Sequence, residues 1–224
     1  MNASVIAAMF WKDLMMEKRA KEMFPQMLAF AVLILVIFQI TLQIGIPAQD
    51  VLPGILWVAL TFAGMLGLNH SVAIERENGC FSGLRLCPVS RSAIFLGKMA
   101  GNWFFLLLMA AVVFPMIVVL FNLTPGWHFI LLAVVIALGS FGFAGIGTLF
   151  AMMSAQTRIR EVLLPMLVFP VLIPLLIAAV NTTANILAQV ALQELWPGLK
   201  FLAIFDVVFV GIALLVAEFV IESE

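Results

Sequence analysis

The strongest constraint on this chain is a succession of six long apolar runs, separated by short polar stretches. We place them at 27–46, 52–74, 97–121, 128–151, 162–180 and 201–221. Each run has roughly the 20 residues that an α-helix needs to cross a hydrocarbon core of about 30 Å. Only 10% of the residues are charged, against about 25% in soluble domains. The sequence therefore predicts an all-α membrane protein with six transmembrane helices, folded as one permease domain over residues 1–224.

Lysine and arginine predict the orientation of these helices. An alternating topology places all but one of the 11 basic residues on the same side of the membrane. They are Lys12, Lys18, Arg19, Lys21, Arg76, Arg85, Arg91, Lys98, Arg158 and Arg160. The opposite side has only Lys200. Because basic loops stay in the cytoplasm, we expect the N-terminus there, and an even number of spans returns the C-terminus to the same side.

Two further helices are expected outside the spans. Residues 1–24 form an imperfect amphipathic helix on the inner face, with Asp13 intruding on its apolar side. On the outer side, apolar residues recur at helical spacing between 181 and 200. We expect a short amphipathic helix there, ended by Trp196-Pro197-Gly198.

The longest charged interval between two spans is Glu75–Arg91, which reads ERENGCFSGLRLCPVSR. It is too short to be a domain, but a cytoplasmic partner could bind it and move the membrane helices through it. Cys80 and Cys87 are seven residues apart, which fits neither a CxxC redox pair nor a c-type haem attachment site. We interpret them as ordinary reduced thiols.

Catalytic and nucleotide-binding motifs are missing from the sequence. It has no P-loop, HExxH or GxSxG pattern, so we expect a non-catalytic protein without a metal site. His70 and His128 belong to opposite ends of predicted spans and cannot share one metal ion. Either could be an axial haem ligand, but a single histidine at a span end is more often an interfacial polar residue.

Four residues within the spans are candidates for a gate. Pro165, Pro170 and Pro174 lie in one predicted helix, where each removes a backbone hydrogen bond and favours a kink. Asp206 lies inside the last span, and intramembrane acids often have a function. We weigh this against a bent but static helix, and against an Asp206 that reaches the outer interface or pairs with Lys200. Small residues repeated in the second and fourth spans predict close helix packing, within the chain or with a second copy.

Several motifs resemble known transporter families. The charged interval, followed by Leu96-Gly97-Lys98, is similar to the signature of ABC-2-type exporter permeases, in which a short coupling helix contacts a cytoplasmic ATPase. This resemblance assigns ATPase coupling to Glu75, Glu77, Gly79, Leu84, Arg85, Pro88 and Ser90. Together with 52–59 (LPGILWVA), 139–148 and 157–165, the interval resembles the haem exporter protein B family, the membrane subunit of the bacterial cytochrome c maturation ABC transporter.

This resemblance implies a permease of the bacterial inner membrane, present in two copies with two ATPase subunits. The implied partners are a haem-handling membrane protein, a small single-span subunit and a periplasmic haem chaperone, whose haem-loaded form ATP hydrolysis would release. No cofactor is expected to bind this chain directly, because haem is handled by the complex and ATP by the partner. Two alternatives remain: an ABC-2 permease for another apolar cargo such as a lipid or drug, and a membrane enzyme or haem-binding protein that uses His70 or His128.

Overall fold

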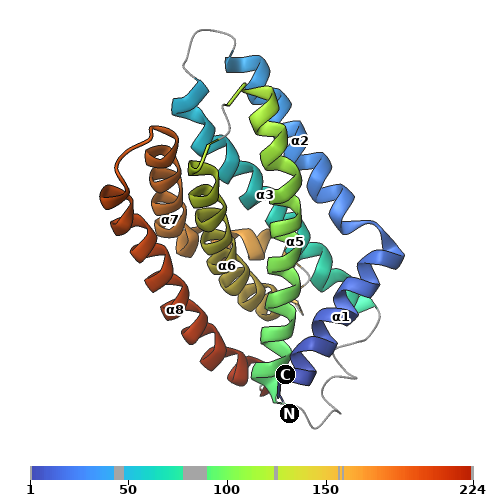
Figure 1. Cartoon of the computed structure of the whole chain (residues 1–224). Coiled ribbons are helices and arrows are strands. Elements are labelled where there is room, and N and C mark those ends of the chain that lie inside the picture. Colours follow the sequence, from blue (N-terminus) through green and yellow to red (C-terminus); the bar gives the residue numbers. More distant parts are fainter. Residues whose placement is uncertain are drawn as a thin grey trace.

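The computed structural model describes residues 2–42, 48–77, 90–123, 126–155, 157 and 159–222. Within these ranges every regular element is a helix (Figure 1). The helices are α1 (Asn2–Ala20), α2 (Met23–Leu42), α3 (Ala48–Glu77), α5 (Arg91–Leu120), α6 (His128–Ser154), α7 (Arg160–Leu187) and α8 (Leu192–Glu222). Of these, 6 helices, namely α2, α3 and α5 to α8, are long and apolar enough to cross a membrane. The protein is a multi-pass membrane protein, as the sequence predicts.

The predicted spans agree with the observed helices in number and order, although most of the helices are longer than predicted. The second span was expected at 52–74, whereas α3 runs from Ala48 to Glu77. The third was expected to begin at residue 97, and α5 begins at Arg91. Hydropathy marks only the apolar part of a helix, while the backbone hydrogen bonds continue into the polar residues at its ends.

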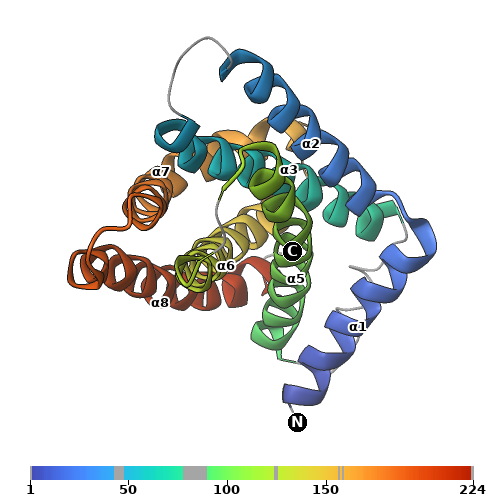
Figure 2. The same cartoon turned by 45° about the horizontal axis from the view of Figure 1, so that its top comes forward.

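Helix α6 lies at the centre of the bundle and packs against α3, α5, α7 and α8 (Figure 2). Its glycines let these neighbours approach closely. A Cβ atom added at Gly139 would lie 2.2 Å from the Trp57 ring, and one at Gly147 would lie 2.3 Å from Leu68. In lipid, such close contacts replace the hydrophobic effect as the force between helices. The predicted packing role of the small residues in α6 is therefore confirmed within one chain.

Buried polar side chains join the helices by hydrogen bonds. Asn102 Nδ2 on α5 donates to Thr148 Oγ1 on α6 over 2.8 Å. Trp57 Nε1 on α3 donates to Thr183 Oγ1 on α7 over 3.0 Å. Because no water reaches the hydrocarbon core, unsatisfied polar groups are costly there, and these bonds fix the helices relative to one another.

The short outer helix predicted between 181 and 200 does not form. Instead, α7 continues to Leu187, α8 begins at Leu192, and Trp196-Pro197-Gly198 lies inside α8. Gly198 packs against α7, because a Cβ atom there would lie 2.1 Å from Thr182 Oγ1. The predicted helix end at this tripeptide is wrong, because its glycine serves close packing between two helices.

Helix α7 contains all three predicted gate prolines, Pro165, Pro170 and Pro174, within one continuous helix. Membrane helices tolerate such prolines because neighbouring helices and local changes in the backbone satisfy the carbonyl groups that lose their hydrogen bonds. A role in gating stays a prediction.

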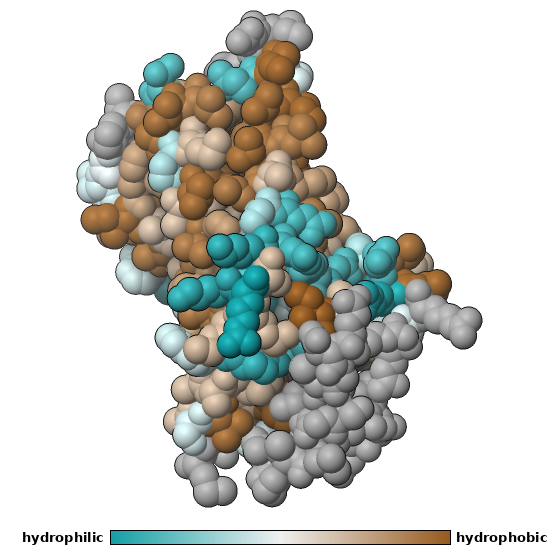
Figure 3. All heavy atoms as spheres, turned by 90° about the vertical axis from the view of Figure 1, so that its right-hand side faces the viewer, coloured by the Kyte–Doolittle hydropathy of each residue, from teal (hydrophilic) through white to brown (hydrophobic). Residues whose placement is uncertain are grey.

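The end of the bundle that carries α1 and the first residues of α2, α5 and α7 is called here the basic end (Figure 1). At the corner between α1 and α2 the backbone turns at Lys21, whose φ is 55°. Glu17 stabilises this corner by accepting a hydrogen bond of 2.9 Å from the Phe24 amide at the start of α2. Figure 3 shows the face with this corner, where a hydrophilic belt lies below an apolar upper half.

Candidate functional site

The predicted ATPase-coupling residues lie within a gap in the described chain and on both sides of it. Gly79, Leu84, Arg85 and Pro88 lie outside the described residues. Glu77 is the last residue of α3, and Ser90 precedes the first residue of α5. The stretch between α3 and α5 is called here the 78–89 segment. The structure therefore describes the two helix ends that flank the segment.

Glu75 lies at one of these helix ends and is buried rather than exposed. Its side chain is 2% accessible, and Oε2 lies 2.7 Å from Nζ of Lys98, which is equally inaccessible. The other carboxylate oxygen, Oε1, accepts a hydrogen bond from Lys12 Nζ on α1. One carboxylate therefore joins three helices, α1, α3 and α5, at the basic end.

Helix α1 reaches this position because α5 presents two glycines to it. A Cβ atom at Gly97 would lie 2.6 Å from Met9 Cβ and 3.1 Å from the Ile6 carbonyl oxygen. One turn later, a Cβ atom at Gly101 would lie 3.2 Å from Asp13 Oδ2. This Gly-x-x-x-Gly spacing allows backbones to approach closely, so that Lys12 and Asp13 are brought next to Lys98.

Lys12, Asp13, Glu75 and Lys98 together form what we call the ionic cluster. Lys12 Nζ also lies 3.3 Å from Asp13 Oδ1. Burial raises the pKa of Asp13, and the nearby Lys98 and Lys12 only partly offset this. Burial alone would lower the pKa of Lys12, but the attraction of Glu75 and Asp13 outweighs it and raises that pKa.

The ionic cluster links the two ends of the 78–89 segment to each other and to α1. Removing one partner of a buried ion pair leaves an uncompensated charge, which is strongly unfavourable. The C-terminal part of α3 is therefore held to α5, and both helices are held to α1. The side chain of Glu75 is only 2% accessible, and its role in ATPase coupling stays a prediction.

Ser90 begins α5 at the other side of the segment. Its backbone is extended, with φ −64° and ψ 133°, and its side chain makes no capping hydrogen bond. Its carbonyl accepts the first bond of the helix, from the Ala93 amide over 3.0 Å. Unlike Glu75, Ser90 is exposed, so its hydroxyl is accessible beside the segment.

Asp206, on α8, is buried in the bundle, with only 4% of its surface exposed. The described ion pairs do not include one between Asp206 and Lys200. Lys200 instead lies over the Trp196 ring, 5.9 Å from its centroid. Asp206 packs against α6, since a Cβ atom at Gly142 would lie 2.3 Å from its Oδ1. Neither carboxylate oxygen has a hydrogen-bond partner among the described residues.

The histidines lie at opposite ends of the bundle, as predicted, with His70 near the end of α3 and His128 at the start of α6. Among the described residues, no group of three or more His, Cys, Asp or Glu could hold a metal ion. The ionic cluster itself was not predicted from the sequence. Its signals were present in Asp13 on the apolar side of α1 and in the Gly97-x-x-x-Gly101 spacing.

Comparison with known proteins decides the family. A family model described as CcmB protein matches residues 4–223. The chain belongs to the CcmB family. The match includes all but the first two residues of α1, so the N-terminal helix is part of the family fold rather than an addition to it. The resemblance predicted from the sequence motifs is confirmed.

Two relatives of this CcmB-family chain are named Heme exporter protein B. The protein of Rhodobacter capsulatus is 30% identical over 172 residues, which cover 76% of this chain and 78% of the relative. The protein of Paracoccus denitrificans is 28% identical over 172 residues, with the same coverage.

Proposed function

We propose that this chain is the permease subunit of an ABC transporter that acts in cytochrome c biogenesis. It couples ATP hydrolysis by a cytoplasmic partner to haem delivery, or to release of a haem-loaded periplasmic chaperone. Membership of the CcmB family and the name of its relatives, Heme exporter protein B, support the haem assignment. The chain itself is non-catalytic in this proposal, and the ATPase activity belongs to the partner.

The observation that carries the coupling proposal is the ion pair between Glu75 and Lys98, 2.7 Å long and almost inaccessible. It holds together the two helices that flank the 78–89 segment. In the proposed mechanism an ATPase subunit binds the segment, and nucleotide binding moves it. The ionic cluster passes this motion to α1, α3 and α5, which shifts the bundle between two arrangements.

The proposal places the basic end in the cytoplasm and the protein in the bacterial inner membrane. The distribution of lysine and arginine supports this orientation. Helix α1 then lies in the inner interface, where the exposed side chains of Trp11 and Met15 contact lipid headgroups and the outer acyl chains.

The complete transporter contains two copies of this chain and two ATPase subunits. It also contains the haem-handling membrane protein and the small single-span subunit that the family resemblance implies, and it acts on the periplasmic haem chaperone. Asp206 and the three prolines of α7 are candidates for the part of the bundle that moves, because Asp206 is a buried carboxylate with no partner among the described side chains.

The alternative proposal is an ABC-2-type exporter of another apolar cargo. The apolar interior of the bundle supports it, because the ionic cluster lies at the basic end rather than along a path across the membrane. Copurification distinguishes the two functions. Cytochrome-maturation proteins copurify with this chain if the first is correct, and only an ATPase copurifies if the second is correct.

Two substitutions, one beside the segment and one within it, test the coupling. Glu77→Lys at the end of α3 and Gly79→Pro should each lower ATP turnover of the assembled complex at least severalfold, since both alter the proposed ATPase contact. The matched control is Glu194→Lys, which reverses an exposed charge at the opposite end of the bundle and should leave turnover unchanged. Normal turnover and normal subunit association in both Glu77→Lys and Gly79→Pro would contradict the proposal.

A further inference from the structure

A cleft opens along α3 at the basic end, away from the ionic cluster. Its floor is α3, and its walls are α2 and α7, which both pack on α3 but do not contact each other within the described residues. The cavity between them has a volume of about 450 Å³, within the roughly 300–1,000 Å³ of small-molecule sites. Phe62, which belongs to the floor of the α2–α7 cleft, is 43% exposed, so the cleft is open to the surroundings of the bundle at this point.

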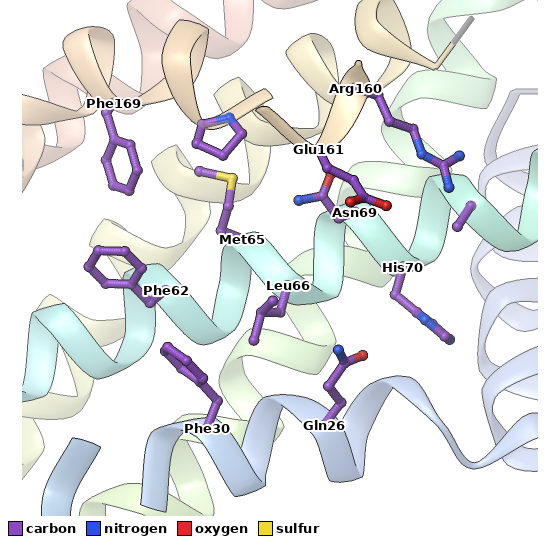
Figure 4. A pocket seen from close by; sticks show the side chains of 12 residues that line it. Gln26, Phe30, Phe62, Met65, Leu66, Asn69, His70, Arg160, Glu161 and Phe169 are labelled. Atoms are coloured by element: carbon purple, nitrogen blue, oxygen red, sulfur yellow. The ribbon is translucent and has the colours of Figure 1, made fainter. Parts of the chain in front are cut away.

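The two ends of the cleft differ in chemistry (Figure 4). Toward the middle of the bundle, three phenylalanines from the three helices close it. The ring centroid of Phe62 on α3 lies 6.4 Å from that of Phe30 on α2 and 5.6 Å from that of Phe169 on α7. These rings offer flat apolar surfaces near the membrane interior, and such surfaces favour a planar aromatic ligand over a flexible acyl chain.

The other end of the cleft is polar and lies at the basic end. Its side chains come from the same three helices and are Gln26, Asn69, His70, Arg160 and Glu161. Arg160 forms no ion pair with any carboxylate that the structure describes, so its guanidinium is available to a ligand. Arginine binds carboxylates through two parallel hydrogen bonds, which suits a ligand with acidic groups at its polar edge.

His70 adds a metal-binding group to this end. Its Nε2 atom is buried without a hydrogen bond, and its nearest acidic neighbour is Glu22 Oε2 at 3.9 Å. Because Nε2 makes no hydrogen bond, the imidazole can turn toward the cleft without breaking a hydrogen bond at this atom. Neutral imidazole is a common ligand of haem iron. The sequence favoured an interfacial role for His70, and the cleft gives this residue a second one.

We propose that the α2–α7 cleft binds haem, with His70 as an iron ligand and Arg160 on a propionate. The cargo class rests on the proposed function, whereas the location rests on the cleft. The apolar macrocycle lies against Phe62 and its two aromatic neighbours, and the carboxylates point to the basic end. A haem dissolved in the adjacent leaflet reaches this site through the open side without crossing the bilayer.

The test is a haem titration of the full-length chain in nanodiscs of phosphatidylcholine, followed by the Soret band. The wild type should show a saturable shift at one haem per chain. His70→Ala should lose the shift and bind haem at least about tenfold more weakly. Tenfold is the lower limit of the loss in metal affinity when a residue that hydrogen-bonds to a metal ligand is removed, and removal of the ligand itself should cost at least as much. His128→Ala is the matched control at the opposite end and should behave like the wild type.

Iron-free protoporphyrin IX distinguishes binding of the porphyrin in the cleft from ligation of the iron by His70. Arg160→Gln should weaken protoporphyrin and haem similarly, because the carboxylate contact needs no iron, while His70→Ala should weaken haem alone. The proposal is overturned if the wild type gives no saturable shift, if His70→Ala matches it, or if His128→Ala abolishes the shift. Displacement of protoporphyrin by phosphatidylglycerol in the nanodiscs would assign the cleft to a lipid headgroup and also overturn it.

Copurification of the ATPase distinguishes a failure of the haem-site proposal from a failure of the proposed coupling function. His70→Ala should retain the ATPase and elute normally in size exclusion, which shows that the fold is intact. A chain that binds the ATPase but shows no His70-dependent haem shift refutes the cleft and leaves the coupling function standing. A chain that binds haem but retains no ATPase refutes the coupling function instead.

Discussion

Removal of the Glu75 carboxylate is the most informative perturbation of the ionic cluster. In Glu75→Leu, Lys98 Nζ loses the oxygen 2.7 Å away while its side chain stays 2% accessible. Leaving one charge of a buried pair without its partner costs about 3–5 kcal/mol. Asp13 lies near enough to attract Lys98, so we expect about 3 kcal/mol, the lower end of that range, or roughly a hundredfold in the unfolding constant.

A double-mutant cycle isolates the pair. Glu75→Leu combined with Lys98→Met replaces both charges by apolar side chains, and replacements of this kind are often neutral or stabilising. The double variant should therefore lie within about 1 kcal/mol of the wild type, which gives a coupling energy of about 2 kcal/mol or more. The assay is reversible unfolding of the detergent-solubilised chain with SDS, followed by tryptophan fluorescence.

A coupling energy below about 0.5 kcal/mol would refute this reasoning, because independent sites are additive within that limit. Glu194→Leu is the control, since it removes an exposed carboxylate and should change stability by no more than about 0.5 kcal/mol. A control variant as unstable as Glu75→Leu would show that the loss reflects net charge rather than the buried pair.

Three further predictions follow from contacts elsewhere in the fold. Gly97→Ala should destabilise the chain by about 1–3 kcal/mol through overpacking, because the added Cβ meets α1. Gly211→Ala is the control, since its Cβ has open space and the change should be neutral or stabilising. Equal melting temperatures of the two variants would contradict this. Thr183→Val should lower the free energy of unfolding by about 1–3 kcal/mol, because it leaves the buried Trp57 N–H unpaired. Unfolding in SDS measures this loss, and an unchanged free energy of unfolding would contradict the prediction. Burial raises the pKa of Asp13 above its ordinary 3.8, so the native state holds that proton more tightly than the unfolded chain, and stability falls as pH rises above about 4. The Tm of Asp13→Asn relative to that of the wild type should therefore rise as the pH increases above about 4. A difference in Tm that does not change with pH would refute the assignment.

The membrane helices could be predicted from the sequence because hydropathy is a local property. Each apolar run satisfies its own backbone hydrogen bonds as a helix, whatever its neighbours do. The same physics explains the wrong prediction at Trp196-Pro197-Gly198. These residues end helices in water, but here the helix continues and Gly198 provides room for Thr182.

The ionic cluster could not be predicted from local patterns. It depends on the position of α1 along α5, which is set where Met9 meets Gly97 and Asp13 meets Gly101. Lys12 and Glu75 are 63 residues apart in the chain, and hydropathy gives no reason to pair them. The α2–α7 cleft was missed for the same reason, since His70 and Arg160 come from helices that are not consecutive.

In the proposed mechanism, force from an ATPase enters this chain through the 78–89 segment on the cytoplasmic side. The native cysteines test it directly, because the chain has 2 cysteines and both, Cys80 and Cys87, belong to that segment. A membrane-impermeant maleimide should label them in inverted inner-membrane vesicles but not in intact spheroplasts, and assembly with the ATPase should slow the labelling. Labelling from the periplasmic side, or equal labelling rates with and without the ATPase, would contradict the account.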